Sequence, residues 1–135
     1  MCLALNVEDP PPHPVPPEHV RQTLLALREV PSRGRAIVLE LEGQVCGYAL
    51  LIAYWSNELG GEVCTIDELY VEPEYRGRRH ATRLIDSLAT GEGLWSPKPV
   101  ALTLEVTPNN VRARQLYERA GFRVHNLAMR RRLLP

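Results

Sequence analysis

The feature that most constrains the fold is an apolar run from Val45 to Tyr54, in which only Gly47 lacks a hydrophobic side chain. Such a run predicts a strand with both faces covered, as in the middle of a sheet with helices on each side. The run is far too short to span a bilayer, which needs about 20 apolar residues. The preceding segment Ala36–Glu42 is rich in strand-forming residues, and Glu42-Gly43-Gln44 is typical of a hairpin turn. We therefore expect the sheet to form around this strand.

The remaining hydrophobic pattern adds strands and helices around the hairpin. Further strands are expected at Val63–Val71, at Val100–Val106 and, as a closing strand, within Phe122–Leu134. One helix is expected from Pro17 to about Arg28, because proline suits a first helical turn. Two more helices are predicted by apolar residues at helical spacing: Ala81, Leu84, Ile85, Leu88 and Ala89 in one, and Ala113, Leu116, Tyr117 and Ala120 in the other. This order predicts an α/β (α+β) fold with a mixed, mostly antiparallel central sheet flanked by helices.

The first nineteen residues are the least globular part of the sequence. Six prolines between residues 10 and 17 remove amide donors and fix φ, which predicts an extended or loosely packed arm. A strand before them would have to fit into Leu3–Val7. At 135 residues the chain is long enough for one hydrophobic core. We therefore expect a proline-rich arm over residues 1–19 and a single domain over residues 20–135.

The composition excludes several classes of function. Sixteen basic and sixteen acidic residues cancel, so no field of the whole molecule would attract nucleic acid or an anionic membrane. Cys2, Cys46 and Cys64 have no metal-ligand spacing and are typical of reduced, mostly buried thiols in a cytosolic protein. Met1–Leu5 lacks the basic residues of a secretion signal. We expect a cytoplasmic protein without a metal site and without a nucleic-acid or membrane partner.

The passage from Ile66 to Thr82 has the composition of a phosphate-binding turn between a strand and a helix. Small residues there let the backbone approach a phosphate, and the unpaired amides of the first helical turn point toward it. Arg76, Arg78 and Arg79 add three guanidinium groups whose forks suit pyrophosphate oxygens. Taken alone, the passage is equally typical of a solvated basic loop without a ligand.

A second passage, after the Val100–Val106 strand, carries six residues at fixed spacing: Asn110, Ala113, Leu116, Tyr117, Gly121 and Phe122. With it the sequence resembles the GNAT superfamily of acyl-CoA N-acyltransferases in both places that are diagnostic of the family. The first is the pyrophosphate loop, commonly [RQ]-x-x-G-x-[GA] after a strand that ends hydrophobic-Val-x-Pro. The second is a helix with N-x-x-A-x-x-L-Y-x-x-x-G-F. The resemblance implies the GNAT fold and the use of acetyl-CoA, without a metal, to acetylate an amine.

The resemblance also implies which residues hold the coenzyme. They are Leu69, Tyr70, Val71, Arg76, Gly77, Arg78, Arg79, His80, Ala81, Thr82, Asn110 and Tyr117. Asn110 resembles the residue that caps the helix and touches the coenzyme, and as an N-cap it is explained even without a ligand. The sequence departs from the family pattern at Arg79, where glycine is usual. A side chain there is strained if its φ is positive, and unstrained if the residue already lies in the first helical turn.

Acetyl transfer to an amine needs few catalytic groups. The amine must be neutral to attack the thioester, and a proton helps the thiolate to leave. Tyr117 resembles the general acid of the family, although its place on an apolar stripe also suits a core residue. Asp67 or Glu68 would remove the amine's proton. Neighbours on a strand face opposite ways, so only one of them faces the acceptor, unless a bulge exchanges them. Either would act directly, through water, or by binding a cationic acceptor.

Three functions are compatible with these features. The favoured one is a cytosolic GNAT-type N-acetyltransferase that acts on a primary amine of a small molecule or protein, by direct attack in a ternary complex. The second is a catalytically weak acyl-CoA-binding regulatory module on the same fold, which would have no need of Tyr117 with Asp67 or Glu68. The third is a basic-loop binder of phosphate or nucleic acid, which the zero net charge disfavours.

Two surface segments complete the sequence-based expectations. The loop Trp55–Gly61 is rich in polar residues and glycine, and is typical of either a lid over the acceptor or a flexible turn. Leu127, Met129 and Leu133 in the expected closing strand need cover, which a homodimer would provide. The basic run Arg130–Arg132 between them is typical of an exposed strand edge.

Overall fold

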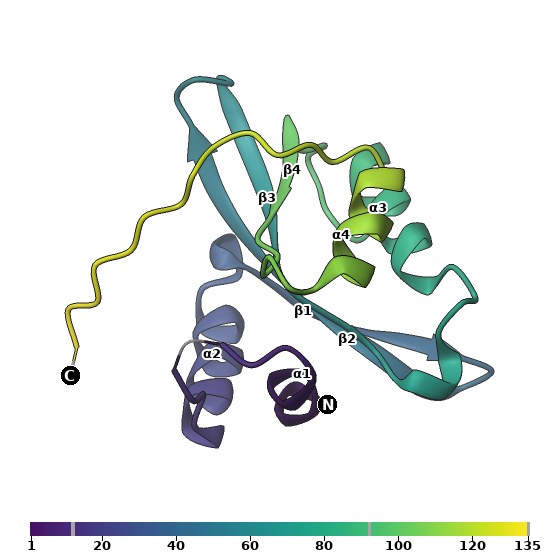
Figure 1. Ribbon diagram of the computed structural model, residues 1–135. Helices are drawn as coiled ribbons and strands as arrows, with labels where there is room; N and C mark the ends of the chain where they lie inside the picture. Colours follow the sequence, from purple (N-terminus) through teal and green to yellow (C-terminus); the bar gives the residue numbers. More distant parts are fainter. Residues whose placement is uncertain (12, 92, 135) are drawn as a thin grey trace.

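The computed structural model describes residues 1–11, 13–91 and 93–134. Within them the strands form one sheet in the order β1-β2-β3-β4, shown in Figure 1. The strands are β1 (Gly34–Leu41), β2 (Gln44–Ser56), β3 (Gly61–Val71) and β4 (Ala101–Leu104). β1, β2 and β3 pair antiparallel, whereas β4 runs parallel to β3. The expectation of a mixed, mostly antiparallel sheet is confirmed.

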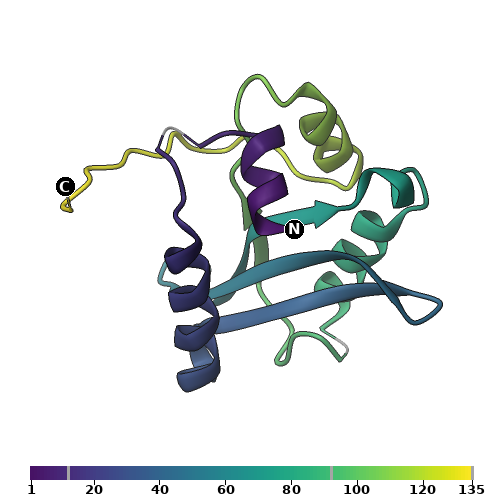
Figure 2. The same ribbon diagram turned by 90° about the horizontal axis from the view of Figure 1, so that it is seen from below.

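Helices cover both faces of this sheet, as Figures 1 and 2 show. α1 (Cys2–Glu8) and α2 (Pro17–Glu29) lie on one face, and α3 (His80–Thr90) and α4 (Val111–Arg119) lie on the other. Within the described ranges, no helix is both long enough and apolar enough to cross a membrane.

The alternation of side chains along β2 creates the two layers. Tyr48 and Leu50 join Leu27 of α2 in one buried cluster. Ala49 and Leu51 point the other way and join a second cluster, which contains the apolar stripe of α3. The expectation that both faces of this strand are covered is therefore confirmed.

β3 bulges where the sequence places its two neighbouring carboxylates. Leu50 of β2 faces Glu68 and Leu51 faces Ile66, so Asp67 is the extra residue without a partner on β2. Beyond this point β3 also separates from its other neighbour, because β4 pairs only with Val63–Ile66. The final residues of β3 therefore keep one free edge.

The N-terminal segment is helical where the sequence left room only for a strand. α1 includes Leu3–Val7, so the expectation of a strand there is wrong. Cys2 and Leu5 pack against the cluster around Leu27, and such packing stabilises a helix too short to persist alone. Residues 10–11 and 13–16 form neither helix nor strand, and Pro12 lies outside the described residues. α2 begins at Pro17, as expected, so the domain boundary expected after residue 19 falls inside this helix.

The closing strand expected within Phe122–Leu134 is absent from the described residues, and that prediction is wrong. The segment runs away from the sheet (Figure 2), and its Leu127 and Met129 are 95% and 96% exposed. A strand needs a neighbour for its backbone hydrogen bonds, but the adjacent β4 is only 4 residues long. An exposed ion pair between Arg130 and Glu105, at 3.5 Å, links the segment to the rest of the chain. Such a pair contributes at most about 1 kcal/mol.

Candidate active site

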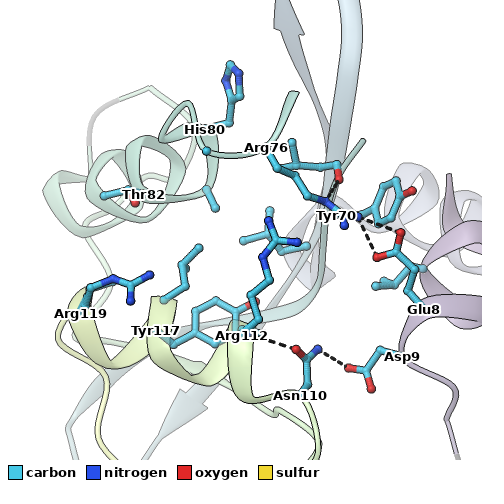
Figure 3. A pocket seen from close by; sticks show the side chains of 18 of the residues that line it. Glu8, Asp9, Tyr70, Arg76, His80, Thr82, Asn110, Arg112, Tyr117 and Arg119 are labelled. Atoms are coloured by element: carbon cyan, nitrogen blue, oxygen red, sulfur yellow. Dashed lines mark hydrogen bonds and ion pairs between the residues drawn. The ribbon is translucent and has the colours of Figure 1, made fainter. Parts of the chain in front are cut away.

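A cavity of about 950 Å³ opens beside the end of β3, between α1, α3 and α4 (Figure 3). This volume lies in the range of small-molecule binding sites. Of the residues that the sequence predicted, those that line it are Leu69, Tyr70, Val71, Arg76, Gly77, Arg79, His80, Ala81, Thr82, Asn110 and Tyr117. The fold thus brings the two motifs, which are separate in the sequence, to one cavity.

The first turn of α3 presents bare backbone amides to this cavity. Arg79 is the N-cap residue, and no side chain caps the helix. The N–H of Arg83 donates to the carbonyl oxygen of Arg79 at 2.9 Å, so helix geometry leaves the amides of His80, Ala81 and Thr82 without a partner inside the helix. Together with the positive end of the helix dipole, these amides suit an anionic group.

Two residues of the loop before α3 have a left-handed backbone. Gly77 has a φ of +76°, and a Cβ added there would meet nothing within 4 Å. Arg79 has a φ of 63° and a ψ of 20°. Its φ is positive, so the side chain strains the backbone at this position. A left-handed conformation costs an L-residue about 1–2 kcal/mol. The chain therefore keeps a strained arginine where the family pattern has glycine.

Arg76 is held by the chain itself. Its Nη2 donates to the two carboxylate oxygens of Glu8 at 3.0 and 2.7 Å, and its Nε donates to the carbonyl oxygen of Val71 at 2.7 Å. The guanidinium also lies over the ring of Tyr70, 5.4 Å from the ring centroid. These contacts tie α1 to the loop before α3. An anion at this loop would have to share Arg76 with Glu8.

The other basic groups differ from those that the sequence indicated. Arg78 lies over the ring of Tyr75, 5.8 Å from the ring centroid, and is not among the cavity-lining residues. Arg112 and Arg119 of α4 line the cavity instead. Neither was predicted from the sequence, although both lie on the helix that carries the second motif. The sequence feature that could have indicated them is a basic residue directly before the first and before the last residue of the apolar stripe.

Tyr117 lines the cavity from α4. The helix begins at Asn110, whose side-chain oxygen accepts from the backbone N–H of Ala113 at 3.1 Å, so the expected N-cap is confirmed. The Tyr117 ring packs edge-on against Phe122, with the ring centroids 5.9 Å apart. Burial and, secondarily, the charge of Asp9 raise the pKa of Tyr117 above the usual phenol value. The phenol therefore stays protonated at neutral pH, as a proton donor must.

The two carboxylates expected to act as a base lie outside the cavity lining. Asp67 lies at the bulge. Partial burial of its carboxyl and then the nearby Glu105 raise its pKa, while Arg130 lowers it. Glu68 accepts a hydrogen bond from the hydroxyl of Tyr48 at 2.7 Å. The loop Trp55–Gly61 also contributes no residue to the lining, and it joins β3 at the end opposite to the cavity.

The end of α1 supplies two acidic residues that the sequence analysis missed. Glu8 pairs with Arg76, and Asp9 accepts hydrogen bonds from Thr107 and Asn110. Both acidic residues line the cavity. The sequence feature that could have indicated these two residues is their position directly before the proline tract. In the described part of the chain, no group of three or more His, Cys, Asp or Glu side chains is placed to hold a metal ion.

Solved acetyltransferases share this fold. A possible acetyltransferase from Clostridium difficile 630 is 19% identical, with a TM-score of 0.75 over 99% of this chain and 86% of its own. A ribosomal-protein-alanine N-acetyltransferase from Brucella melitensis biovar Abortus 2308 is 23% identical, with a TM-score of 0.69 over 97% and 88%. The aminoglycoside N-acetyltransferase AAC(6')-Iy, in complex with CoA, is 17% identical, with a TM-score of 0.63 over 87% and 90%. At these identities the likeness shows the fold.

The sequence itself matches the model of the acetyltransferase (GNAT) family over residues 3–122. This match takes in all but the first residue of α1, both motifs and every strand of the described sheet. The chain therefore belongs to the acetyltransferase (GNAT) family. Among the curated proteins, no sequence matches it.

Proposed function

We propose that this protein transfers the acetyl group of acetyl-CoA to a primary amine of a small molecule or protein, by direct attack in a ternary complex. The observation that carries the proposal is that the bare amides of α3 and the phenol of Tyr117 line one cavity. The amides suit a pyrophosphate, and the phenol suits a leaving thiolate. Membership of the acetyltransferase family supports both assignments.

The coenzyme would be held from two sides. The amides of His80, Ala81 and Thr82 would bind the pyrophosphate, and Arg79 and Arg119 would add charge-assisted hydrogen bonds. The free edge of β3 at residues 69–71 offers backbone groups to the amides of the pantetheine arm, as an open strand edge does for an extended ligand. Bound there, acetyl-CoA would supply the activated acetyl thioester.

Tyr117 would act as the general acid. As the amine nitrogen bonds to the acetyl carbon and the carbon–sulfur bond breaks, the phenol would give its proton to the sulfur. Neither Asp67 nor Glu68 enters this proposal as a base, because neither lines the cavity. The amine would lose its proton to water, and the tyrosinate left after proton donation would take up a proton from water. Holding the two reactants together then supplies most of the rate enhancement.

A free-thiol assay over a panel of acceptors tests this function. The panel holds simple amines, polyamines, aminoglycosides and peptides with a free N-terminus, each with acetyl-CoA and with Tyr117→Phe as the control. We expect thiol release that depends on the acceptor and falls in the control. Binding of acetyl-CoA without thiol release for any acceptor would favour the catalytically weak binding module instead.

We also propose a homodimer formed through the C-terminal segment 123–134. Leu127 and Met129 of this segment are almost fully exposed, and Leu133 is 84% exposed. Contact with a second copy would remove these side chains from water. Light scattering at micromolar concentration should give twice the mass of one chain. A mass of 15.2 kDa would reject the dimer.

The cysteines support a cytoplasmic location for the proposed enzyme. Cys46 and Cys64 are free and fully buried, and Cys2 is free and partly buried. Thiols stay reduced in the cytoplasm, whereas oxidising compartments favour disulfides.

A further inference from the structure

The carboxylate of Asp9 is held in a fixed orientation at the junction of α1 and α4. Its Oδ1 accepts from the hydroxyl of Thr107 at 2.6 Å, and its Oδ2 accepts from Nδ2 of Asn110 at 2.9 Å. Asn110 is itself fixed, because its side-chain oxygen caps α4. Asp9 therefore has little freedom to turn away from the cavity that it lines (Figure 3).

The charge of Asp9 is not neutralised by the chain. Its neighbour Glu8 forms an ion pair with Arg76, but the hydrogen-bond partners of Asp9 are a hydroxyl and an amide, which are neutral. Across the described residues, no ion pair joins Asp9 to a basic side chain. A partly buried carboxylate without a cation is electrostatically unsatisfied, and it favours a ligand that brings a positive charge.

Asp9 also lies within electrostatic reach of the proposed acid. Its charge is one of the two causes that raise the pKa of Tyr117. Both side chains line the cavity, and both belong to its α1–α4 side (Figure 3). A group bound by Asp9 would therefore share the cavity with the phenol, at which the acetyl group is to be transferred.

We propose that Asp9 is the specificity residue for the acceptor, and that the acceptor is an amine bound in its positively charged form. This inference rests on the proposed acetyl transfer and adds the class of substrate to it. The carboxylate would accept hydrogen bonds from the ammonium group and hold it beside Tyr117. Loss of the ammonium proton, which must precede attack on the thioester, is a separate step and goes to water.

Asp9→Asn tests the proposal because it removes the charge and keeps the shape. The new amide can accept from Asn110 and donate to the Thr107 oxygen. Asp86→Asn is the matched control, because Asp86 is exposed on α3 and does not line the cavity.

The acceptors in this test are cadaverine, which is cationic at neutral pH, and hydroxylamine, which is neutral. We expect Asp9→Asn to lower the ratio of kcat/KM for cadaverine to kcat/KM for hydroxylamine by about tenfold to a hundredfold. Asp86→Asn should leave this ratio unchanged.

A second measurement uses only the wild-type protein and does not depend on turnover. Cadaverine is titrated by calorimetry into protein saturated with coenzyme A, at low and at high salt. Salt-sensitive binding supports the proposal, since salt screens the attraction between exposed charges. An unchanged ratio in Asp9→Asn, or no cadaverine binding at either salt concentration, overturns it. A preceding titration with coenzyme A alone tests the proposed function separately, because its failure would show that the cavity is not a coenzyme site.

Discussion

The two sides of the cavity carry opposite charges and are built in different ways. On the α3 side, positive potential comes from backbone amides and a helix dipole, reinforced by Arg79. On the α1 side, negative potential comes from the side chains of Glu8 and Asp9, which contacts with distant residues hold in place. The Arg76–Glu8 ion pair joins the two sides.

This difference indicates how one cavity would receive two substrates. A polyanion is attracted to the α3 side and repelled by the carboxylates of α1, while a cation experiences the reverse. The two ligands would therefore bind in one relative orientation, with their reactive ends near Tyr117. Substitutions at four positions separate the contributions of the two sides, and the largest expected effect lies at their junction.

Tyr117→Phe removes only the hydroxyl at this junction. The single-turnover rate should fall by about a hundredfold to ten-thousandfold, as is typical for a positioned acid. The Kd for acetyl-CoA should stay nearly the same, because the ring keeps its packing against Phe122. Since burial and Asp9 raise the pKa of Tyr117, the wild-type rate should persist at pH values above the ordinary phenol pKa of about 10. Wild-type single-turnover rates in the Phe variant would remove Tyr117 from the mechanism.

Gly77→Asp places a negative charge on the positive side of the cavity. The new side chain has free space, so the fold should survive, while repulsion of the pyrophosphate costs about 2 kcal/mol. The Kd for acetyl-CoA should then rise roughly thirtyfold. Gly77→Asn requires the same left-handed backbone at this position but adds no charge. It should bind acetyl-CoA almost as well as wild type. Equal affinities of the Asp and Asn variants would show that the loop does not face the coenzyme.

Glu8→Gln breaks the ion pair between the two sides and frees Arg76 for an anion. Because partly exposed pairs contribute about 0.2–1 kcal/mol, acetyl-CoA should bind up to about fivefold more tightly at low salt. Glu18→Gln is the control, since Glu18 pairs with Arg21 on the exposed face of α2. Calorimetry measures both variants. Weaker binding by Glu8→Gln would mean that the ion pair holds the site in its binding shape.

Arg79→Gly and Arg79→Ala test the strain on the α3 side. Both remove the guanidinium, but only glycine adopts the left-handed backbone at this position without a steric penalty. The Gly variant should therefore have a free energy of unfolding about 1 kcal/mol higher than that of the Ala variant. Denaturant titration measures the difference. Equal values would contradict the left-handed conformation of Arg79.

Much of the fold and one side of the cavity were predictable because their signals are local. The apolar run of β2 and the helical stripes of α3 and α4 each lie within one element, so periodicity reveals them. The same holds for the loop before α3, whose amides and arginines are contiguous. Two side chains of this loop could not be assigned from sequence alone. The strain at Arg79 depends on a backbone angle, and Arg78 lies over the ring of Tyr75 and is not among the cavity-lining residues.

The other side of the cavity depends on contacts that sequence patterns do not show. Asp9 bonds with Thr107, which is 98 residues away, and α1 is stabilised by packing against α2 and β2. The proline tract also favoured an extended arm over residues 1–19, although a helix precedes the tract. At the other terminus, Leu127 and Met129 lie two residues apart, as side chains on one face of a strand do. This spacing does not provide the neighbour that a strand requires.

Whether the cavity is a coenzyme site is tested most directly by calorimetric titration of acetyl-CoA into the wild-type chain, with ATP as a competing polyanion. One molecule of acetyl-CoA should bind per chain, and ATP at the same concentration should not displace it, because only the thioester arm reaches the free edge of β3 and Tyr117. No binding of acetyl-CoA, or binding that ATP abolishes, would contradict the assignment of the cavity.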